Sequence, residues 1–132
     1  MLVADTSALY ALINRRDQHN KAVVDLFLAE TSSIIVPVAV LSELAWMVET
    51  RVGHDAMAAF LDDCQNGGFQ LVWREADLPR IQELMRRYAD LPLGFADAAV
   101  IALAEGGSSR VATTDRRHFT VVRAKRPLEL LP

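Results

Sequence analysis

Four acidic residues of this sequence occupy positions where an ionised side chain needs a particular reason: Asp5, Glu43, Asp97 and Asp115. In the stretch Pro37–Val48 the only ionisable side chain is Glu43. In Leu91–Ala104 the only one is Asp97. Burying a lone carboxylate among apolar residues costs several kcal/mol unless a metal ion or a charged partner compensates it. These stretches therefore point to a cation site or to buried ion pairs.

A cluster of carboxylates without histidine or cysteine ligands is typical of a site for a hard cation, Mg²⁺ or Mn²⁺. Repulsion among the carboxylates raises some of their pKa values in the empty site, and a divalent ion relieves that repulsion. Such a site suits phosphodiester hydrolysis, in which the ion polarises the phosphate, activates a water molecule and stabilises the leaving oxygen. The residue types thus predict metal-dependent hydrolysis of a phosphodiester.

Each acid also has a purely structural explanation. Asp5 is suited to capping the first helix, and Asp115 to capping a short turn over Arg116–Phe119. Asp97 lies in the first turn of its helix, where the macrodipole favours a negative charge. Glu43 is suited to an ion pair with an arginine. These explanations serve single residues, whereas a metal site accounts for all four if the fold gathers them.

Short apolar runs alternate with helix-forming stretches along the 132 residues, a length that fits one compact domain, 1–132. Strands are expected at Met1–Ala4, Ser33–Val36, Phe69–Trp73, Arg110–Thr114 and, as a last short piece, near Leu128–Leu131. Helices are expected at Ala8–Asn14, Asn20–Glu30, from Pro37 until Gly53, His54–Asn66, Asp77–Tyr88 and Gly94–Glu105. This alternation predicts an α/β fold with a mainly parallel central sheet of four or five strands and helices on both faces.

The ends of the expected strands decide where the acids lie. In an open parallel sheet the ligand crevice lies beyond the carboxyl ends of the strands, where the strand order reverses. Asp5 follows the first strand and Asp115 the fourth, so their carboxylates meet if the strand order is 3-2-1-4-5. Glu43 and Asp97 lie near the starts of helices that begin at the same edge. We therefore expect one acidic site at this edge.

Composition excludes several classes of protein. The single cysteine, Cys64, allows no disulfide framework within the chain and has no partners for a zinc site. The segment Met1–Asp5 lacks the basic start of a secretory signal, and Leu91–Ala104 is too short to cross a bilayer. We expect a cytoplasmic protein that has no membrane partner.

The charges give two opposing indications about nucleic acid. A net charge of −3 argues against such a partner. However, 12 of the 14 basic residues are arginine, whose guanidinium fork suits phosphate better than an ammonium does. Six of them form adjacent pairs: Arg15-Arg16, Arg86-Arg87 and Arg116-Arg117. For any one pair, solvated surface charge is the alternative.

Four segments together resemble a known family: Val3–Leu9 (Val-Ala-Asp-Thr-Ser-Ala-Leu), Ser42–Leu44 (Ser-Glu-Leu), Leu91–Val100 (Leu-Pro-Leu-Gly-Phe-Ala-Asp-Ala-Ala-Val) and Thr113–Phe119 (Thr-Thr-Asp-Arg-Arg-His-Phe). In this order and spacing they resemble the PIN-domain family and, within it, the VapC-type ribonuclease toxins. The resemblance spans nearly the whole chain. A lone Asp-Thr-Ser is a weak signal, but the four segments together are specific.

The resemblance implies that the acidic catalytic quartet is Asp5, Glu43, Asp97 and Asp115. Asp5 and Asp97 would be the principal ligands of Mg²⁺ (or Mn²⁺). Glu43 and Asp115 would complete the metal's coordination directly or through water. Asp90 also matches a pattern found in part of the family, but a Leu-Pro step separates it from the helix, so we expect it to be peripheral.

Three hydroxyl residues have supporting roles by the same resemblance. Thr6 or Ser7 would orient Asp5 or the metal-bound water. Thr113 would do the same for Asp115.

The resemblance further implies a sheet-centred three-layer sandwich, a homodimer, and inhibition by a small antitoxin whose C-terminal segment occupies the groove. The implied function is metal-dependent RNA hydrolysis by the toxin of a toxin–antitoxin pair. Two alternatives stay open: a PIN-fold module that binds RNA or protein without cutting, and a stand-alone RNA-processing nuclease. For RNA binding we expect Arg116-Arg117, which follow Asp115 directly, and next Arg15-Arg16 after the first helix. Arg86-Arg87 are the least suited pair.

Two other families also begin with an aspartate after their first strand, but they fit less well. A phosphatase of the haloacid-dehalogenase type needs a second aspartate two residues on, where this chain has Ser7. A response-regulator receiver needs an aspartate at the end of the third strand, where this chain has Trp73-Arg74.

The histidines and tryptophans receive structural interpretations. His19 and His54 are expected at helix starts, and His118 among surface arginines, none of them catalytic. Trp46 and Trp73 are expected to fill the core or a dimer interface rather than to stack on bases.

Overall fold

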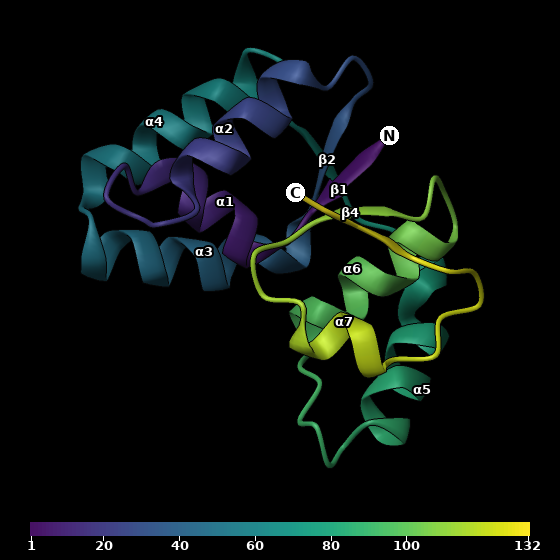
Figure 1. Ribbon diagram of the computed structural model, residues 1–132. Helices are drawn as coiled ribbons and strands as arrows, with labels where there is room; N and C mark the ends of the chain where they lie inside the picture. The colour runs from purple at the N-terminus through teal and green to yellow at the C-terminus, as the bar shows by residue number, and fades with distance from the viewer.

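A five-stranded parallel sheet forms the centre of the molecule, in a computed structural model that describes residues 1–132 (Figure 1). Its strands are β1 (Leu2–Ala4), β2 (Ile34–Pro37), β3 (Gln70–Val72), β4 (Arg110–Ala112) and β5 (Glu129–Leu131). They lie in the order β3-β2-β1-β4-β5, and every neighbouring pair is parallel. The predicted strand order is therefore confirmed. All of β1 is buried, as expected for a strand covered on both faces.

Seven α-helices surround the sheet: α1 (Thr6–Ile13), α2 (Asn20–Ala29), α3 (Val38–Arg51), α4 (His54–Gln65), α5 (Leu78–Arg87), α6 (Phe95–Glu105) and α7 (Arg117–Val121). A 3-10 turn, η1 (Glu75–Asp77), precedes α5. Figure 1 shows α1 to α4 gathered on one side of the strands and α5 to α7 on the other, which gives the predicted α/β arrangement with helices on both faces. The short turn expected after Asp115 is the helix α7.

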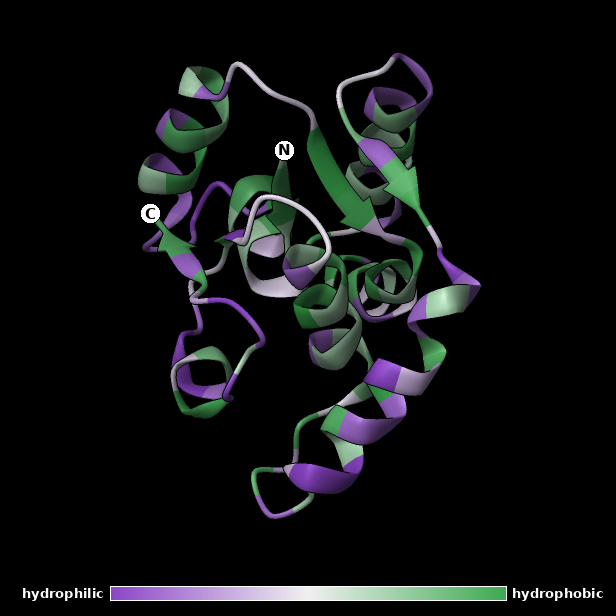
Figure 2. Cartoon of the chain, turned by 90° about the vertical axis from the view of Figure 1, so that its right-hand side faces the viewer, coloured by the Kyte–Doolittle hydropathy of each residue, from purple (hydrophilic) through white to green (hydrophobic).

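Helix α6 forms the centre of the core and thereby fixes the position of Asp97. Every residue from Ala98 to Glu105 is buried, and the helix packs against β1, β2 and β4. A helix that is apolar on all sides is stable only when it is enclosed. Figure 2 shows this contrast, with hydrophobic strands at the centre and a strongly mixed α5 at the periphery. Asp97, in the first turn of α6, is the point where this buried helix meets the edge of the sheet.

The other end of α6 carries a buried acid with a full set of partners. Glu105 receives two hydrogen bonds from the guanidinium of Arg80 on α5, at 2.9 and 2.7 Å, and one from the backbone of Lys125 at 3.0 Å. Burial alone would raise the pKa of Glu105, but these partners hold it below its ordinary value. The carboxylate thereby ties α5 and the C-terminal segment to the end of α6.

Neither tryptophan lies in the core, so that part of the expectation is wrong. Helix α3 buries the stripe Val40, Leu44 and Val48, whereas Trp46 points to the opposite side and is 63% exposed. Trp73 follows the edge strand β3 and is 49% exposed, with its ring 6.5 Å from that of Phe95. None of the helices has the length and apolar character needed to span a membrane.

Candidate active site

All four predicted acids line one cavity of about 250 Å³ at the carboxyl edge of the sheet. Its remaining lining residues are Thr6, Ser7, Met47 and His118. We call this space the acidic cavity. Strand β1 ends at Asp5 and β4 ends three residues before Asp115, while α3 and α6 bring in Glu43 and Asp97. The topology thus gathers residues that are far apart in the sequence.

Asp5 is a helix cap and a member of the cavity at the same time. Its Oδ1 accepts hydrogen bonds from the backbone N–H of Ala8 and from the hydroxyl of Ser7, both at 2.8 Å. The residue is only 3% exposed. Burial raises the pKa of Asp5 to about 6, although hydrogen bonds from Thr113, Ala8 and Ser7 partly lower it. The neighbouring charge of Asp97 raises it further.

A hydroxyl network joins the turn after β1 to the end of β4. The Oγ of Ser7 accepts a hydrogen bond from the backbone of Thr114 at 2.9 Å and lies 3.2 Å from the hydroxyl of Thr113. The Thr113 hydroxyl in turn accepts the backbone N–H of Asp115 at 3.0 Å. Between the two candidates for orienting Asp5, Ser7 therefore makes the contact, while Thr6 is buried in the cavity wall.

His118 is the polar residue of the cavity that the sequence interpretation missed. Its Nδ1 lies 2.8 Å from Oδ2 of Asp97, and both side chains are about 30% exposed, at 30% and 27%. Burial raises the pKa of Asp97, the bond to His118 lowers it, and the charges of Glu43 and Asp115 raise it again. The signal available in the sequence was the apolar Phe119, which is buried in the core and holds the short helix α7 against it.

Asp115 is paired with the arginine two residues on. The Nε of Arg117 donates to one carboxylate oxygen at 3.0 Å and its terminal nitrogen to the other at 2.9 Å. This guanidinium holds the pKa of Asp115 below its ordinary value. Arg116 turns the other way and donates to the carbonyls of Leu130 and Pro132 at the end of β5. The two adjacent arginines therefore bind different partners.

Glu43 and Asp90 differ in their relation to the cavity. Glu43 is exposed on α3 and lines the cavity together with Met47, one turn along the same helix face. It takes part in none of the ion pairs of the structure, so the arginine partner considered for it is not found. Asp90 is exposed in the turn after α5 and does not line the cavity.

The donor set fits a hard divalent cation, with one rearrangement. The cavity offers carboxylate and hydroxyl oxygens, which are the ligands that Mg²⁺ and Mn²⁺ prefer. In the present arrangement no three acidic or imidazole groups lie close enough together to hold one ion. The fork of Arg117 on Asp115 is mostly solvent-exposed, with 83% of the arginine side chain accessible. An ion pair this exposed contributes little to stability, so exchanging the guanidinium for a cation would cost little.

The second predicted arginine pair lies away from the acids. Arg15 and Arg16 follow the C-terminal end of α1 and line a separate, larger pocket together with Arg51 of α3. Arg51 was not among the predicted residues, because it lies far from the pair in the sequence.

Comparison with known proteins identifies the family. Residues 2–125 match the PIN domain. Over 124 residues the chain is 33% identical to "Ribonuclease VapC26" of Mycobacterium tuberculosis, covering 92% of each protein. The chain belongs to the PIN-domain family, in its VapC-type branch. The resemblance found in the four sequence segments is thereby confirmed.

Solved structures of PIN-domain proteins share the fold. M. tuberculosis VapC20, described as a sarcin–ricin loop cleaving toxin, superposes with a TM-score of 0.80 at 20% identity, over 96% of this chain and 99% of VapC20. VapBC2 of Rickettsia felis, solved bound to a fragment of its promoter DNA, gives 0.72 at 17% identity, over 99% of this chain and 98% of the other. FitAcB of Neisseria gonorrhoeae gives 0.65 at 18% identity, over 100% and 97%. The predicted PIN-like sheet is thus confirmed.

Proposed function

We propose that this PIN-domain protein is a metal-dependent endoribonuclease and the toxin of a toxin–antitoxin pair. The observation that carries the proposal is the convergence of four carboxylates on one small cavity at the carboxyl edge of the sheet. The name of the 33% identical relative, a ribonuclease, supports RNA as the substrate. The VapBC2 complex among the structural relatives supports an antitoxin partner. The proposed site of action is the cytoplasm.

The residues divide the work of holding Mg²⁺ or Mn²⁺. Asp5 and Asp97 are proposed as principal ligands, and Glu43 and Asp115 as further ligands, directly or through water. Once bound, the ion would polarise the scissile phosphate and lower the pKa of an attacking water. Ser7 keeps Asp5 in position, and His118 occupies one oxygen of Asp97, which leaves the other free for the cavity.

The products follow from attack by water. Hydrolysis needs no ribose 2′-hydroxyl, so we expect a 5′-phosphate and a 3′-hydroxyl on the fragments. Incubating total RNA with the purified protein and Mn²⁺, then mapping both kinds of end, tests this directly. Loss of cleavage in EDTA and in the Asp97→Asn variant is the matched control. A 2′,3′-cyclic phosphate product would contradict the mechanism.

The arginines after Asp115 are proposed to hold the RNA backbone near the scissile phosphate. Arg117 has the stronger claim, because its guanidinium is exposed beside the acidic cavity while that of Arg116 is bonded to the end of β5. RNA affinity of the Arg116→Ala/Arg117→Ala variant should be measured against salt in an Asp5→Asn background. For single-stranded RNA, each phosphate that the protein no longer binds lowers the salt slope by about 0.7. An unchanged slope would mean that the pair is only surface charge.

A homodimer is proposed as the assembly. The surface around α5 exposes apolar side chains in an open groove of about 780 Å³, including Leu78, Met85 and Phe95. Exposed apolar groups that gather in this way mark a contact surface. Sedimentation of the free protein should give twice the 14.6 kDa chain mass, and Phe95→Glu should return it to one.

A further inference from the structure

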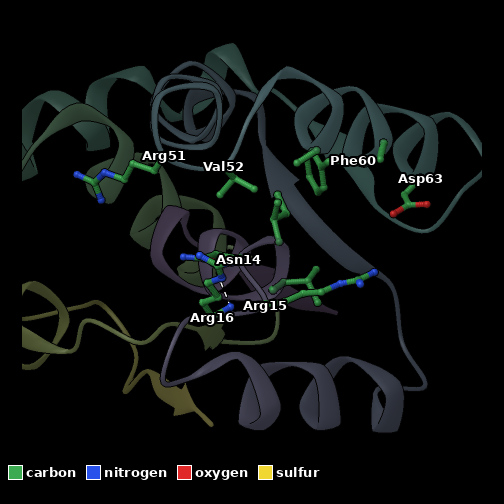
Figure 3. Close-up of a pocket in the computed structure, with 11 residues that line it drawn as sticks. Asn14, Arg15, Arg16, Arg51, Val52, Phe60 and Asp63 are labelled. Carbon is green, nitrogen blue, oxygen red and sulfur yellow. Dashed lines mark hydrogen bonds between the residues drawn. The ribbon is translucent and has the colours of Figure 1, made fainter.

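A second large pocket lies at the far ends of the same helices that form the acidic cavity. It has a volume of about 740 Å³ and is enclosed by the end of α1, the end of α3 and one face of α4. Figure 3 shows Arg51 at the end of α3 with Val52 just after it, Phe60 and Asp63 from α4, and the segment that carries Arg15 and Arg16 after α1. We call it the basic pocket.

The arginines of the basic pocket have no acidic partners. None of Arg15, Arg16 and Arg51 takes part in an ion pair of the structure, and all three are exposed. Arg51 instead lies over the ring of Tyr10, 5.6 Å from its centre. The single acid in the lining, Asp63, leaves a local excess of positive charge. Guanidinium groups held without a carboxylate are free to bind another anion.

The two sites lie along the same two helices, α1 and α3. Helix α3 presents Glu43 and Met47 to the acidic cavity and Arg51 to the basic pocket, three positions spaced by four residues along one face. Helix α1 begins at the acidic cavity and ends at the basic pocket, and α1 packs against α3. Eight helical residues rise about 12 Å. A single nucleic-acid strand spans such a distance in a few nucleotides.

We propose that the basic pocket binds the RNA strand a few nucleotides away from the scissile phosphate. The inference rests on the proposed ribonuclease function and adds a substrate-binding site to it. Phosphates contact the three arginines, and the apolar floor that includes Ile13, Val52 and Phe60 accepts a base. In Figure 3 the Arg51 and Arg15 side chains extend in opposite directions, so that they reach different phosphates.

The charge distribution favours a polyanion as the occupant. The chain carries a net charge of −3 and its acidic cavity repels phosphate until a cation binds, so RNA needs positive charge elsewhere on the surface. The basic pocket supplies this charge at a fixed distance from the acids. An RNA strand bound at both the basic pocket and the acidic cavity is also positioned for reaction. Hydrolysis at the acidic cavity requires such positioning.

The test measures binding rather than cleavage. An Asp5→Asn protein, which is unable to cut, is titrated with a fluorescent pool of short mixed-sequence single-stranded RNA over a range of salt concentrations. In the Arg15→Gln/Arg16→Gln/Arg51→Gln variant the affinity at low salt should fall by about tenfold or more. The salt slope should fall by about 0.7 for each phosphate of the single strand that the variant no longer binds. Lysine at the same three positions should restore most of the slope.

A matched variant separates a local effect from a change of net charge. Arg87→Gln/Arg123→Gln/Lys125→Gln removes the same charge from exposed positions outside the basic pocket and should leave the slope nearly unchanged. Thermal melts check that both triple variants are folded. Equal effects of the two variants, or no effect of the first, would overturn the inference while leaving the proposed function in place. If the first variant kept RNA binding and lost only the binding of a protein partner, the pocket would belong to that partner and the inference would be overturned. No RNA binding by the parent protein would overturn the ribonuclease proposal itself.

Discussion

The acidic cavity and the basic pocket share two helices but are built in opposite ways. In the acidic cavity nearly every charged group has a partner that fixes it: Ser7 holds Asp5, His118 holds Asp97 and Arg117 holds Asp115. In the basic pocket the arginines are exposed and free of ion pairs. Side chains that take part in chemistry are thus fixed by hydrogen bonds in a small cavity. Side chains that bind a flexible polymer keep their conformational freedom.

The largest expected effect is on the rate of RNA cleavage, and it distinguishes the acidic cavity from the basic pocket. Asp5→Asn and Asp97→Asn should each reduce RNA cleavage by at least about 10³-fold, because both remove a proposed cation ligand. Arginine variants of the basic pocket should chiefly raise the RNA concentration needed for half-maximal rate. Initial rates at low and at saturating RNA measure both. Cleavage that survives either aspartate substitution would remove the acidic cavity from the mechanism.

The same Asp5→Asn change should not weaken the fold. Asp5 has a pKa of about 6, above its ordinary 3.8, so folding favours its protonated form. The stability from this group is complete below about pH 4 and is lost as the pH rises through about 6. In EDTA at about pH 7.5, the Asp5→Asn protein should therefore melt at an equal or higher temperature, with a gain in unfolding free energy of at most about 3 kcal/mol. A clear drop would show that capping of α1 is the main task of Asp5.

Cation binding should depend on pH through the same carboxyl. Below about pH 6 a proton competes for Asp5, so the affinity for Mn²⁺ should weaken by up to about tenfold per pH unit. RNA binding by the basic pocket does not involve Asp5, so in the Asp5→Asn protein it should vary less over this range. Isothermal titration of the free protein with Mn²⁺ between about pH 5 and 7.5 measures the effect. A flat profile would contradict the assignment of Asp5 as a ligand.

A smaller effect tests whether His118 holds Asp97. The contact uses Nδ1, which the amide nitrogen of asparagine can imitate, whereas that of glutamine reaches the position of Nε2. His118→Asn should keep the affinity for Mn²⁺, and His118→Gln should weaken it by about tenfold. Equal loss in both variants would indicate that the imidazole ring itself is needed.

The smallest effect concerns the exposed pair at Asp115. Removing the fork in Arg117→Gln frees this carboxylate, so the affinity for Mn²⁺ should rise, by no more than about fivefold because the pair is largely in solvent. Arg116→Gln is the matched control, since its guanidinium is bonded to the end of β5 instead. A weaker affinity in Arg117→Gln would show that the arginine supports the cation site.

The parts predictable from sequence are those fixed by local pattern and topology. Short apolar runs such as Leu2–Ala4 indicate buried strands, and the helices between them favour parallel order. Once that order holds, Asp5 and Asp115 must meet at one edge. By contrast, no pattern in the sequence indicated that Glu105 would be buried and hydrogen-bonded to α5 and the C-terminal segment.

The parts that escaped prediction depend on side-chain direction and on long-range packing. His118 reaches the acidic cavity because Phe119 anchors a helix where the sequence pattern indicated only a turn. Trp46 is exposed because the buried stripe of α3 runs along its other face. Arg51 joins Arg15 only through the packing of α3 on α1. The neighbours Arg116 and Arg117 point to different partners, which adjacency in a sequence does not reveal.

Because the sheet is parallel, the two ends of the described chain lie at opposite edges of it, so a fusion at one end is near the acidic cavity and a fusion at the other is not. Met1 lies at the amino edge of β1, opposite the acidic cavity. Pro132 follows β5 at the carboxyl edge, where Arg116 grips its carbonyl and Thr113 donates to that of Leu131. An affinity tag or a reporter fused after Pro132 therefore starts beside the loop that carries Asp115. A fusion before Met1 leaves that loop undisturbed.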